Sequence, residues 1–225
     1  MTDLSRHHPE LLQRLHQTCL ACGRDPTAVT LLAVSKTQPA ERLREAHALG
    51  QRHFGENYLQ EALGKMEALT DLDICWHFIG PIQSNKTRAI AERFSWVHSI
   101  DRLKIAQRLN DQRPAQLDPL NVLIEVNVDA EASKQGVAPE EVPALAAAIA
   151  QLPRLTLRGL MAIPAATNDD HNRAAFTRLA MTLAQLPPTM GADQLSMGMS
   201  DDFETAIACG STWVRIGSAL FGARH

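Results

Sequence analysis

Short apolar segments and amphipathic helical segments alternate along almost the whole chain of 225 residues. Apolar segments of strand length indicate strands buried on both faces, and helices between them make neighbouring strands parallel. The alternation supplies eight strands, with seven helices between them, from residue 30 to residue 216. It therefore predicts an α/β protein with a closed (β/α)8 TIM-like barrel. An open dinucleotide-binding sheet would carry a G-x-G-x-x-G turn after its first strand, and the sequence has none there.

The predicted elements form one barrel domain over residues 1–225, with an extra N-terminal helix in which Leu11, Leu12, Leu15 and Cys19 fall at helical spacing. The predicted strands are 30–35, 53–57, 75–80, 96–100, 121–128, 155–163, 194–197 and 212–216. The predicted helices are 39–49, 59–69, 84–93 with a cap at Ser84, 102–112, one opening at Pro139, 171–186 and 202–209.

Charge and hydropathy exclude some classes of protein. The net charge of -3 argues against a general nucleic-acid or membrane-surface binder. No signal-peptide core or run of 18 apolar residues is present, so we expect a cytoplasmic protein without a membrane span. Cys19 and Cys22 have C-x-x-C spacing but lack a second pair or a histidine cluster beside them. We interpret that spacing as incidental and assign no metal ligands.

Lys36 follows the first predicted strand directly, and barrel enzymes gather their chemistry at the carboxyl ends of the strands. Partial burial at such a place favours the neutral amine, the nucleophilic form that Schiff-base chemistry requires. The alternative is a surface lysine whose ammonium reaches solvent at the strand end. Position alone does not decide between them.

Two glycine- and serine-containing turns follow the last two predicted strands. SMGMSDD at 196–202 precedes a helix, and the spacing of Asp201 and Glu204 predicts a capping box. RIGSALFG at 215–222 places Gly217 and Ser218 directly after the eighth strand. With Ser200, these groups suit a phosphate, unless they are ordinary turns. A phosphate site near a strand-one lysine indicates either pyridoxal phosphate or a phosphosugar aldolase.

Three further residues are ambiguous. His77 is more typical of a core or supporting histidine than of a catalyst. Lys86 is either a solvated charge or a phosphate ligand, and we interpret Lys134 as an exposed lysine in a polar loop.

Taken together, the motifs closely resemble the YggS/PROSC family of pyridoxal phosphate homeostasis proteins. The matching stretches lie in order from residue 31 to residue 222. They are LLAVSKTQP, HFGENYLQE, WHFIGPIQSNK, GLMAI, LSMGMSDDFETAI and VRIGSALFG.

The resemblance implies the barrel of bacterial alanine racemase without its C-terminal β-domain, and pyridoxal 5'-phosphate as the cofactor. It also implies the site residues: Lys36 for the Schiff base, Ser200, Gly217 and Ser218 for the phosphate, Arg215 facing the ring nitrogen, Asn57 and Met161 around the ring, and Lys134 in a segment thought to influence cofactor exchange.

These assignments favour a protein that holds cofactor over an enzyme. A guanidinium beside the ring nitrogen disfavours its protonation, so reactions such as transamination should be weak. A two-base racemase needs a second base, and the only tyrosine, Tyr58, lies within the GENY motif. We therefore assign no catalytic residue and expect a monomer that handles vitamin B6 in the cell, with apoenzymes as transient partners. An amino-acid racemase is the enzyme alternative, and a class I aldolase is a more distant one.

Overall fold

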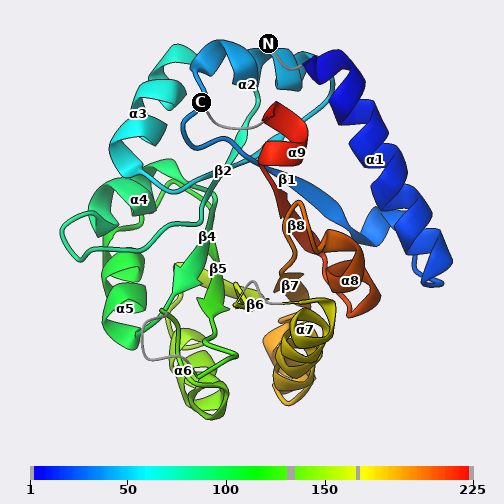
Figure 1. The fold of residues 1–225 in the computed structure, drawn as a ribbon. Helices are drawn as coiled ribbons and strands as arrows, with labels where there is room; N and C mark the ends of the chain where they lie inside the picture. The colour runs from blue at the N-terminus through cyan, green and yellow to red at the C-terminus, as the bar shows by residue number, and fades with distance from the viewer. Residues whose placement is uncertain (1–2, 131–134, 166–167, 223–225) are drawn as a thin grey trace.

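Eight parallel strands close into a barrel in sequence order in the computed structural model, which describes residues 3–130, 135–165 and 168–222 (Figure 1). β1 pairs with both β2 and β8, which closes the barrel. The predicted fold class is confirmed. The strands are β1 Thr30–Val34, β2 His53–Glu56, β3 Cys75–Phe78, β4 Trp96–Ile100, β5 Leu120–Glu125, β6 Leu155–Met161, β7 Gln194–Ser196 and β8 Trp213–Ile216.

A helix follows each strand and returns the chain to the same end of the barrel, as parallel pairing requires. The α-helices after the strands are α2 Ala40–Ala48, α3 Leu59–Ala68, α4 Thr87–Arg93, α5 Leu103–Gln112, α6 Val142–Ile149, α7 Asp169–Ala184, α8 Phe203–Ala208 and the short α9 Ser218–Phe221. Three 3-10 turns complete the described elements: η1 Pro26–Ala28, η2 Pro139–Glu141 and η3 Pro188–Met190.

The extra N-terminal helix is α1, Leu4–Ala21, which lies against α8 and α9 on the outside of the barrel (Figure 1). The Asp3 carboxylate accepts a hydrogen bond from the backbone N–H of Ser5 and so caps the helix. Leu11, Leu15 and Cys19 belong to its buried stripe, as their spacing predicts, whereas Leu12 is exposed. No helix in the described part of the chain combines the length and apolar character needed to cross a membrane.

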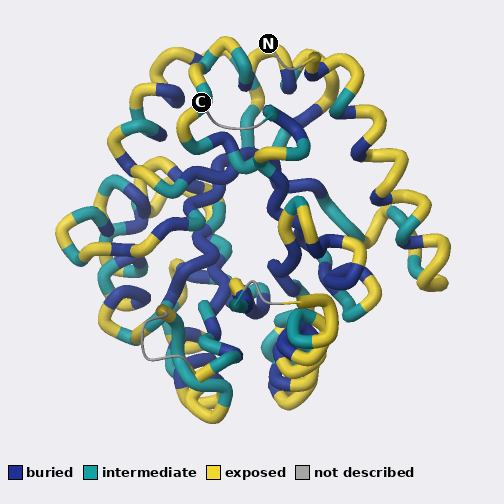
Figure 2. The backbone as a smooth tube through the Cα atoms, in the orientation of Figure 1, coloured by how far each residue is buried: buried dark blue, intermediate teal, exposed yellow. Residues whose placement is uncertain are grey.

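The hydrophobic core fills the layer between the strands and the surrounding helices, where the backbone is mostly buried (Figure 2). Phe54, Phe78 and Phe176 are almost fully buried in this layer. Each such side chain contributes about 1.5–3 kcal/mol through removal from water. This layer holds the strand ends in fixed positions and therefore positions the residues that follow them.

Two helix starts differ from the predicted ones. α4 begins at Thr87, whose hydroxyl donates to the Ser84 carbonyl, so Ser84 is not its cap. α8 begins after Asp202, whose carboxylate accepts from the Met199 backbone N–H and not from the helix. Glu204 pairs with Arg14 of α1. The predicted capping box of Asp201 and Glu204 is therefore wrong, because the helix begins one residue later than expected, after Asp202, and Glu204 is paired with Arg14.

Candidate functional site

A cavity of about 200 Å³ opens where the carboxyl ends of β1, β2 and β8 meet. Six of the seven predicted site residues line it; they come from four separate stretches of the sequence. The barrel thus brings together Lys36, Asn57, Ser200, Arg215, Gly217 and Ser218. We refer to this space as the Lys36 cavity.

The backbone on both sides of Lys36 is held by a network reaching from α3. Lys65 Nζ donates to the Ser35 carbonyl at 2.6 Å, and the Thr37 N–H donates to Glu61 Oε1 at 2.6 Å. Thr37 has a φ of 67°, which a non-glycine residue rarely adopts, and its contact with Glu61 supports that turn. Lys36 itself is half-buried at the cavity wall. Its backbone is therefore fixed, while the side chain reaches into the cavity.

Glu56 completes this network from the end of β2. Its Oε1 accepts from Lys65 Nζ at 2.7 Å and from the Ser35 hydroxyl at 2.6 Å, and its side chain is fully buried. Burial raises the pKa of the Glu56 carboxyl, while Lys65 and Ser35 act in the opposite direction. A buried ion pair of this kind is sensitive to the loss of either partner.

Hydroxyl and backbone donors from the loops after β7 and β8 meet at one side of the cavity. The Ser218 hydroxyl donates to Ser200 Oγ at 3.0 Å, and the Ala219 N–H lies 3.3 Å from the same oxygen. A Cβ at Gly217 would lie 3.3 Å from the Val34 carbonyl oxygen, so glycine lets the two strand ends approach. Several small donors in one place suit an anion with several acceptor oxygens, such as a phosphate group. We refer to the hydroxyls of Ser200 and Ser218 and the Ala219 N–H as the anion cradle.

Arg215 projects from β8 and is held rigidly. One guanidinium nitrogen donates to the carbonyl and the hydroxyl of Ser196 at 2.6 and 2.9 Å, and the other donates to the Ala162 carbonyl at 2.9 Å. Burial lowers the pKa of Arg215 to about 10, so the group stays charged at neutral pH. The cavity therefore has a fixed positive charge at its floor.

Asn57 lies at the end of β2 and approaches the glycine after β3 closely. A Cβ at Gly80 would be only 2.2 Å from the Asn57 carbonyl oxygen, so any larger residue would push the two ends apart. Asn57 Oδ1 is buried and has no hydrogen-bond partner among the described residues. An unpaired buried amide oxygen at a cavity wall is suited to a ligand that brings its own donor.

The other predicted residues lie elsewhere. Met161 is buried at the end of β6 with an exposed fraction of 1%, and the wall position nearby is taken by Ile163. Lys86 lines a separate cavity of about 560 Å³, which shares Asn57 with the Lys36 cavity. Lys134 lies outside the described residues. Cys19 is buried and Cys22 is exposed, and neither forms a disulfide.

Sequence reasoning missed several residues that line the Lys36 cavity. Most are apolar and lie at or shortly after the end of a strand, so the sequence does not distinguish them from core residues: Val34, Ile79, Ile163 and Met199. Asp201 also lines it, although its spacing suggested a helix cap. Glu125 lies in a neighbouring cavity that also includes Ile163, and burial raises its pKa to about 7. The carboxylate within the apolar stretch NVLIEVNV was the available signal.

The barrel interior below Arg215 contains a hydrogen-bonded series of histidines. His98 lies 2.9 Å from Ser196 Oγ, His77 lies 2.9 Å from His98, and His53 lies 3.0 Å from His77. Burial lowers the pKa of His77 and His98 well below the usual range. His77 is thus an interior residue outside the Lys36 cavity, in line with the expectation of a supporting role.

Fold and site together define a (β/α)8 barrel with a lysine and an anion cradle at one mouth. The family model for the alanine racemase N-terminal domain matches residues 16–225. Curated relatives called pyridoxal phosphate homeostasis protein are 62% identical in Pseudomonas aeruginosa and 52% identical in Escherichia coli K12. Both cover all of this chain, which spans 97% and 98% of their lengths.

Solved structures agree with this result. PipY of Synechococcus elongatus, determined with PLP bound, has a TM-score of 0.81 and 37% identity over 92% of this chain and 100% of its own. Alanine racemase of Corynebacterium glutamicum shares the fold, with a TM-score of 0.68 at 18% identity over 95% of this chain and 62% of its own. The chain belongs to the alanine racemase N-terminal domain family and, within it, to the pyridoxal phosphate homeostasis proteins. The resemblance to the YggS/PROSC family is confirmed.

Proposed function

We propose that the chain binds pyridoxal 5'-phosphate in the Lys36 cavity, as a Schiff base on Lys36, and acts in intracellular vitamin B6 homeostasis. The observation that carries the proposal is the convergence of a half-buried lysine, an anion cradle and a fixed arginine on one cavity. The PLP-bound structure of PipY and the names of the curated relatives support it.

The residues present fit this cofactor. When bound, pyridoxal phosphate supplies an aldehyde for an amine and an electron-withdrawing ring. Ser200, Ser218 and the Ala219 N–H would hold the phosphate through hydrogen bonds. Arg215 would face the ring nitrogen from the floor, and Asn57 would supply its unpaired amide oxygen at the wall.

Arg215 favours holding the cofactor over using it in catalysis. Its contacts with Ser196 and Ala162 keep the positive charge in place, which disfavours a proton on a neighbouring ring nitrogen. An unprotonated ring is a weak acceptor of electrons, so reactions that depend on that property would be slow. We therefore propose storage and delivery, with transient apoenzymes as recipients.

Borohydride reduction followed by peptide mapping tests the proposal. Wild type should absorb as a lysine Schiff base and carry the reduced label on Lys36, and Lys36→Ala should lose both. Lys104→Ala, on the exposed face of α5, is the matched control and should behave as wild type. An unchanged spectrum in Lys36→Ala would contradict the proposal.

A racemase is the second candidate, because the barrel is that of alanine racemase and burial raises the pKa of Glu125, beside the mouth, to about 7. Tyr58, the residue type that serves as second base in alanine racemases, is 56% exposed and lines the other cavity. Deuterium exchange at the α-carbon, screened over amino acids, separates the two candidates. Lys36-dependent exchange at catalytic rates would establish the enzyme.

We also propose that the protein is a cytoplasmic monomer with residues 1–225 as one domain. Sedimentation at several protein concentrations tests the monomer, and localisation of a tagged chain tests the compartment. Delivery is tested by mixing the loaded protein with a cofactor-dependent apoenzyme. Activity should appear faster than spontaneous release of the cofactor allows.

A further inference from the structure

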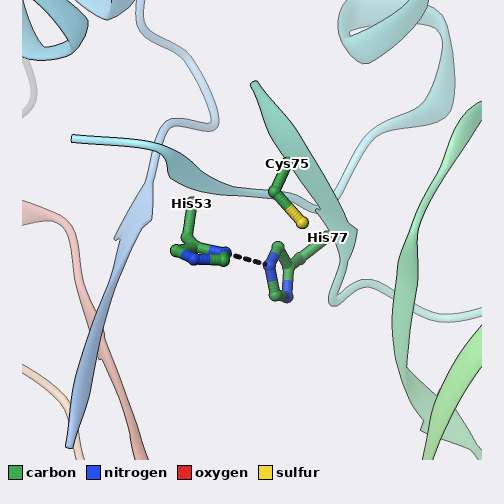
Figure 3. Close-up of side chains that lie close together, drawn as sticks. All are labelled: His53, Cys75 and His77. Carbon is green, nitrogen blue, oxygen red and sulfur yellow. Dashed lines mark hydrogen bonds between the residues drawn. The ribbon is translucent and has the colours of Figure 1, made fainter. Parts of the chain in front are cut away.

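Three ligand-type side chains meet inside the barrel, away from the Lys36 cavity. The imidazoles of His53 and His77 and the thiol of Cys75 converge from β2 and β3 (Figure 3). One ligand atom from each lies within 4.8 Å of the others. His53 Nδ1 and His77 Nε2 are 3.0 Å apart and hydrogen-bonded.

The pairing of two neighbouring strands produces this convergence. His53 is opposite Cys75 and Gly55 is opposite His77 in the parallel register. Cys75 and His77 are two residues apart, so they project to the same side of the sheet. Because Gly55 has no side chain, His77 meets no side chain of β2 at its own register position and lies toward His53. On its other side, His77 stacks on Trp96 of β4. The cluster therefore arises from the pairing of two strands in the barrel, and no contiguous sequence motif contains all three residues.

We propose that His53, Cys75 and His77 form a binding site for a zinc-class divalent ion. Two imidazoles and one thiolate are a preferred donor set for such ions. Tetrahedral zinc, with bonds of about 2.0–2.3 Å, places its ligand atoms about 3.3–3.6 Å apart. The present spacing needs only small side-chain movements to reach this, with the ion replacing the hydrogen bond between the histidines.

The surroundings of His77 orient it for this role. His77 Nδ1 lies 2.9 Å from His98 Nε2, and His98 Nδ1 lies 2.9 Å from Ser196 Oγ. With its proton on Nδ1, His77 donates to His98 and leaves the Nε2 lone pair directed at the cluster. Metal-bound histidines usually have such a partner on the second nitrogen. Ser196 then accepts from both His98 and Arg215, which links the ion site to the floor of the Lys36 cavity.

The site is reachable from solvent at the amino ends of the strands. His53 is half-buried and lines a cavity of about 440 Å³ together with Thr30, Gln51 and His8 of α1. Cys75 is also half-buried. A water molecule would supply the fourth ligand, as in other sites with three protein ligands. The ion therefore enters from the end of the barrel opposite to Lys36, and this proposal does not depend on cofactor binding.

Packing alone is the competing explanation for the cluster. His53 and His77 contact the Trp213 ring at centroid distances of 5.0 and 4.9 Å, and His77 stacks on Trp96. These contacts would hold the histidines in place without an ion. If packing alone explains the cluster, Cys75 has no role in binding zinc. If the cluster is an ion site, the Cys75 sulfur is one of the zinc ligands.

X-ray absorption of the cofactor-loaded protein after dialysis against zinc distinguishes them. The expected zinc neighbours are one sulfur at about 2.3 Å and light atoms at about 2.0–2.1 Å, at one zinc per chain. Competition with a chromophoric chelator then gives the dissociation constant. Cys75→Ser and His53→Asn should each weaken it by about 100-fold or more, since losing even a supporting partner costs about 10–100-fold.

Exposed residues provide the matched controls. Cys22→Ser and His16→Asn change the same residue types at exposed positions and should leave zinc affinity unchanged. Circular dichroism and cofactor absorbance check that each variant is folded. Failure of wild type to bind zinc, zinc without a sulfur neighbour, or equal affinity in folded Cys75→Ser would each overturn the proposal.

Discussion

Lys65 Nζ donates to the carbonyl oxygen of Ser35 at 2.6 Å, and so joins the buried face of α3 to the residue immediately before Lys36. The same ammonium pairs with Glu56, whose side chain is fully buried. The position of Lys36 thus depends on a residue that lies 29 positions later in the sequence. The proposed cofactor lysine is preorganised by an ion pair that does not line its cavity.

Lys65→Met should destabilise the protein by about 3–5 kcal/mol, because it leaves the Glu56 carboxylate buried without its partner. Urea denaturation at neutral pH measures the change. Lys104→Met, at an exposed position on α5, is the control and should change stability by less than about 0.5 kcal/mol. Equal stabilities of the two variants would show that the ion pair contributes nothing.

Ser200→Ala and Ser218→Ala should each weaken binding of pyridoxal phosphate by about 10-fold or more, because a hydrogen bond to a charged group contributes about 1.5–3 kcal/mol. Spectrophotometric titration gives the dissociation constants. Pyridoxal, which lacks the phosphate, is the control ligand, and its affinity should not change. A parallel loss for both ligands would place the serines away from the phosphate.

The sequence predicted the barrel and most of the candidate site because both follow from local pattern and position. The apolar segments show where each strand ends, and barrel closure brings the strand ends together. Lys36, Ser200 and Gly217 could therefore be assigned to one mouth before any contact was known. Sequence alone does not show whether Met161 or the nearby Ile163 lines the cavity, because this depends on local packing.

The missed features depend on contacts that residue spacing does not specify. Glu204 has a cap-forming side chain, but it pairs with Arg14 of α1, and the carboxylate before the helix, Asp202, accepts from the Met199 N–H within its own turn. The cluster of His53, Cys75 and His77 likewise arises from strand register, which pattern alone does not specify at single-residue precision.

Glu125 should make the protein less stable as the pH rises. Burial, the largest cause, raises its pKa from 4.5 to about 7, so the folded state binds a proton that the unfolded chain has released. The free energy of unfolding therefore has its full value below about pH 4.5 and falls progressively as the pH rises to about 7. Wild type and Glu125→Gln should match at acidic pH, and the variant should gain up to about 3 kcal/mol relative to wild type at pH 8.

Chemical denaturation of the cofactor-depleted proteins from pH 4.5 to pH 8 measures this difference. Asp193→Asn, which removes one carboxylate at an exposed position before β7, is the control for the general effect of losing a negative charge. A constant offset between wild type and Glu125→Gln across this range would show that the Glu125 pKa is not raised.

Gly198→Ala should destabilise the turn that leads from β7 to the anion cradle. Gly198 has a φ of +93°, and an added Cβ would lie 2.5 Å from the Cβ of Ala206 in α8. The strained backbone and the close contact together should cost more than about 1 kcal/mol and weaken cofactor binding through displaced Ser200. Gly64→Ala in α3 is the opposite case, because an added Cβ meets nothing within 4 Å. It should stabilise the protein by about 0.5–1 kcal/mol, as alanine replaces glycine within a helix. Thermal unfolding of both variants compares them directly, and a Gly198→Ala protein as stable as Gly64→Ala would show that this turn tolerates a side chain.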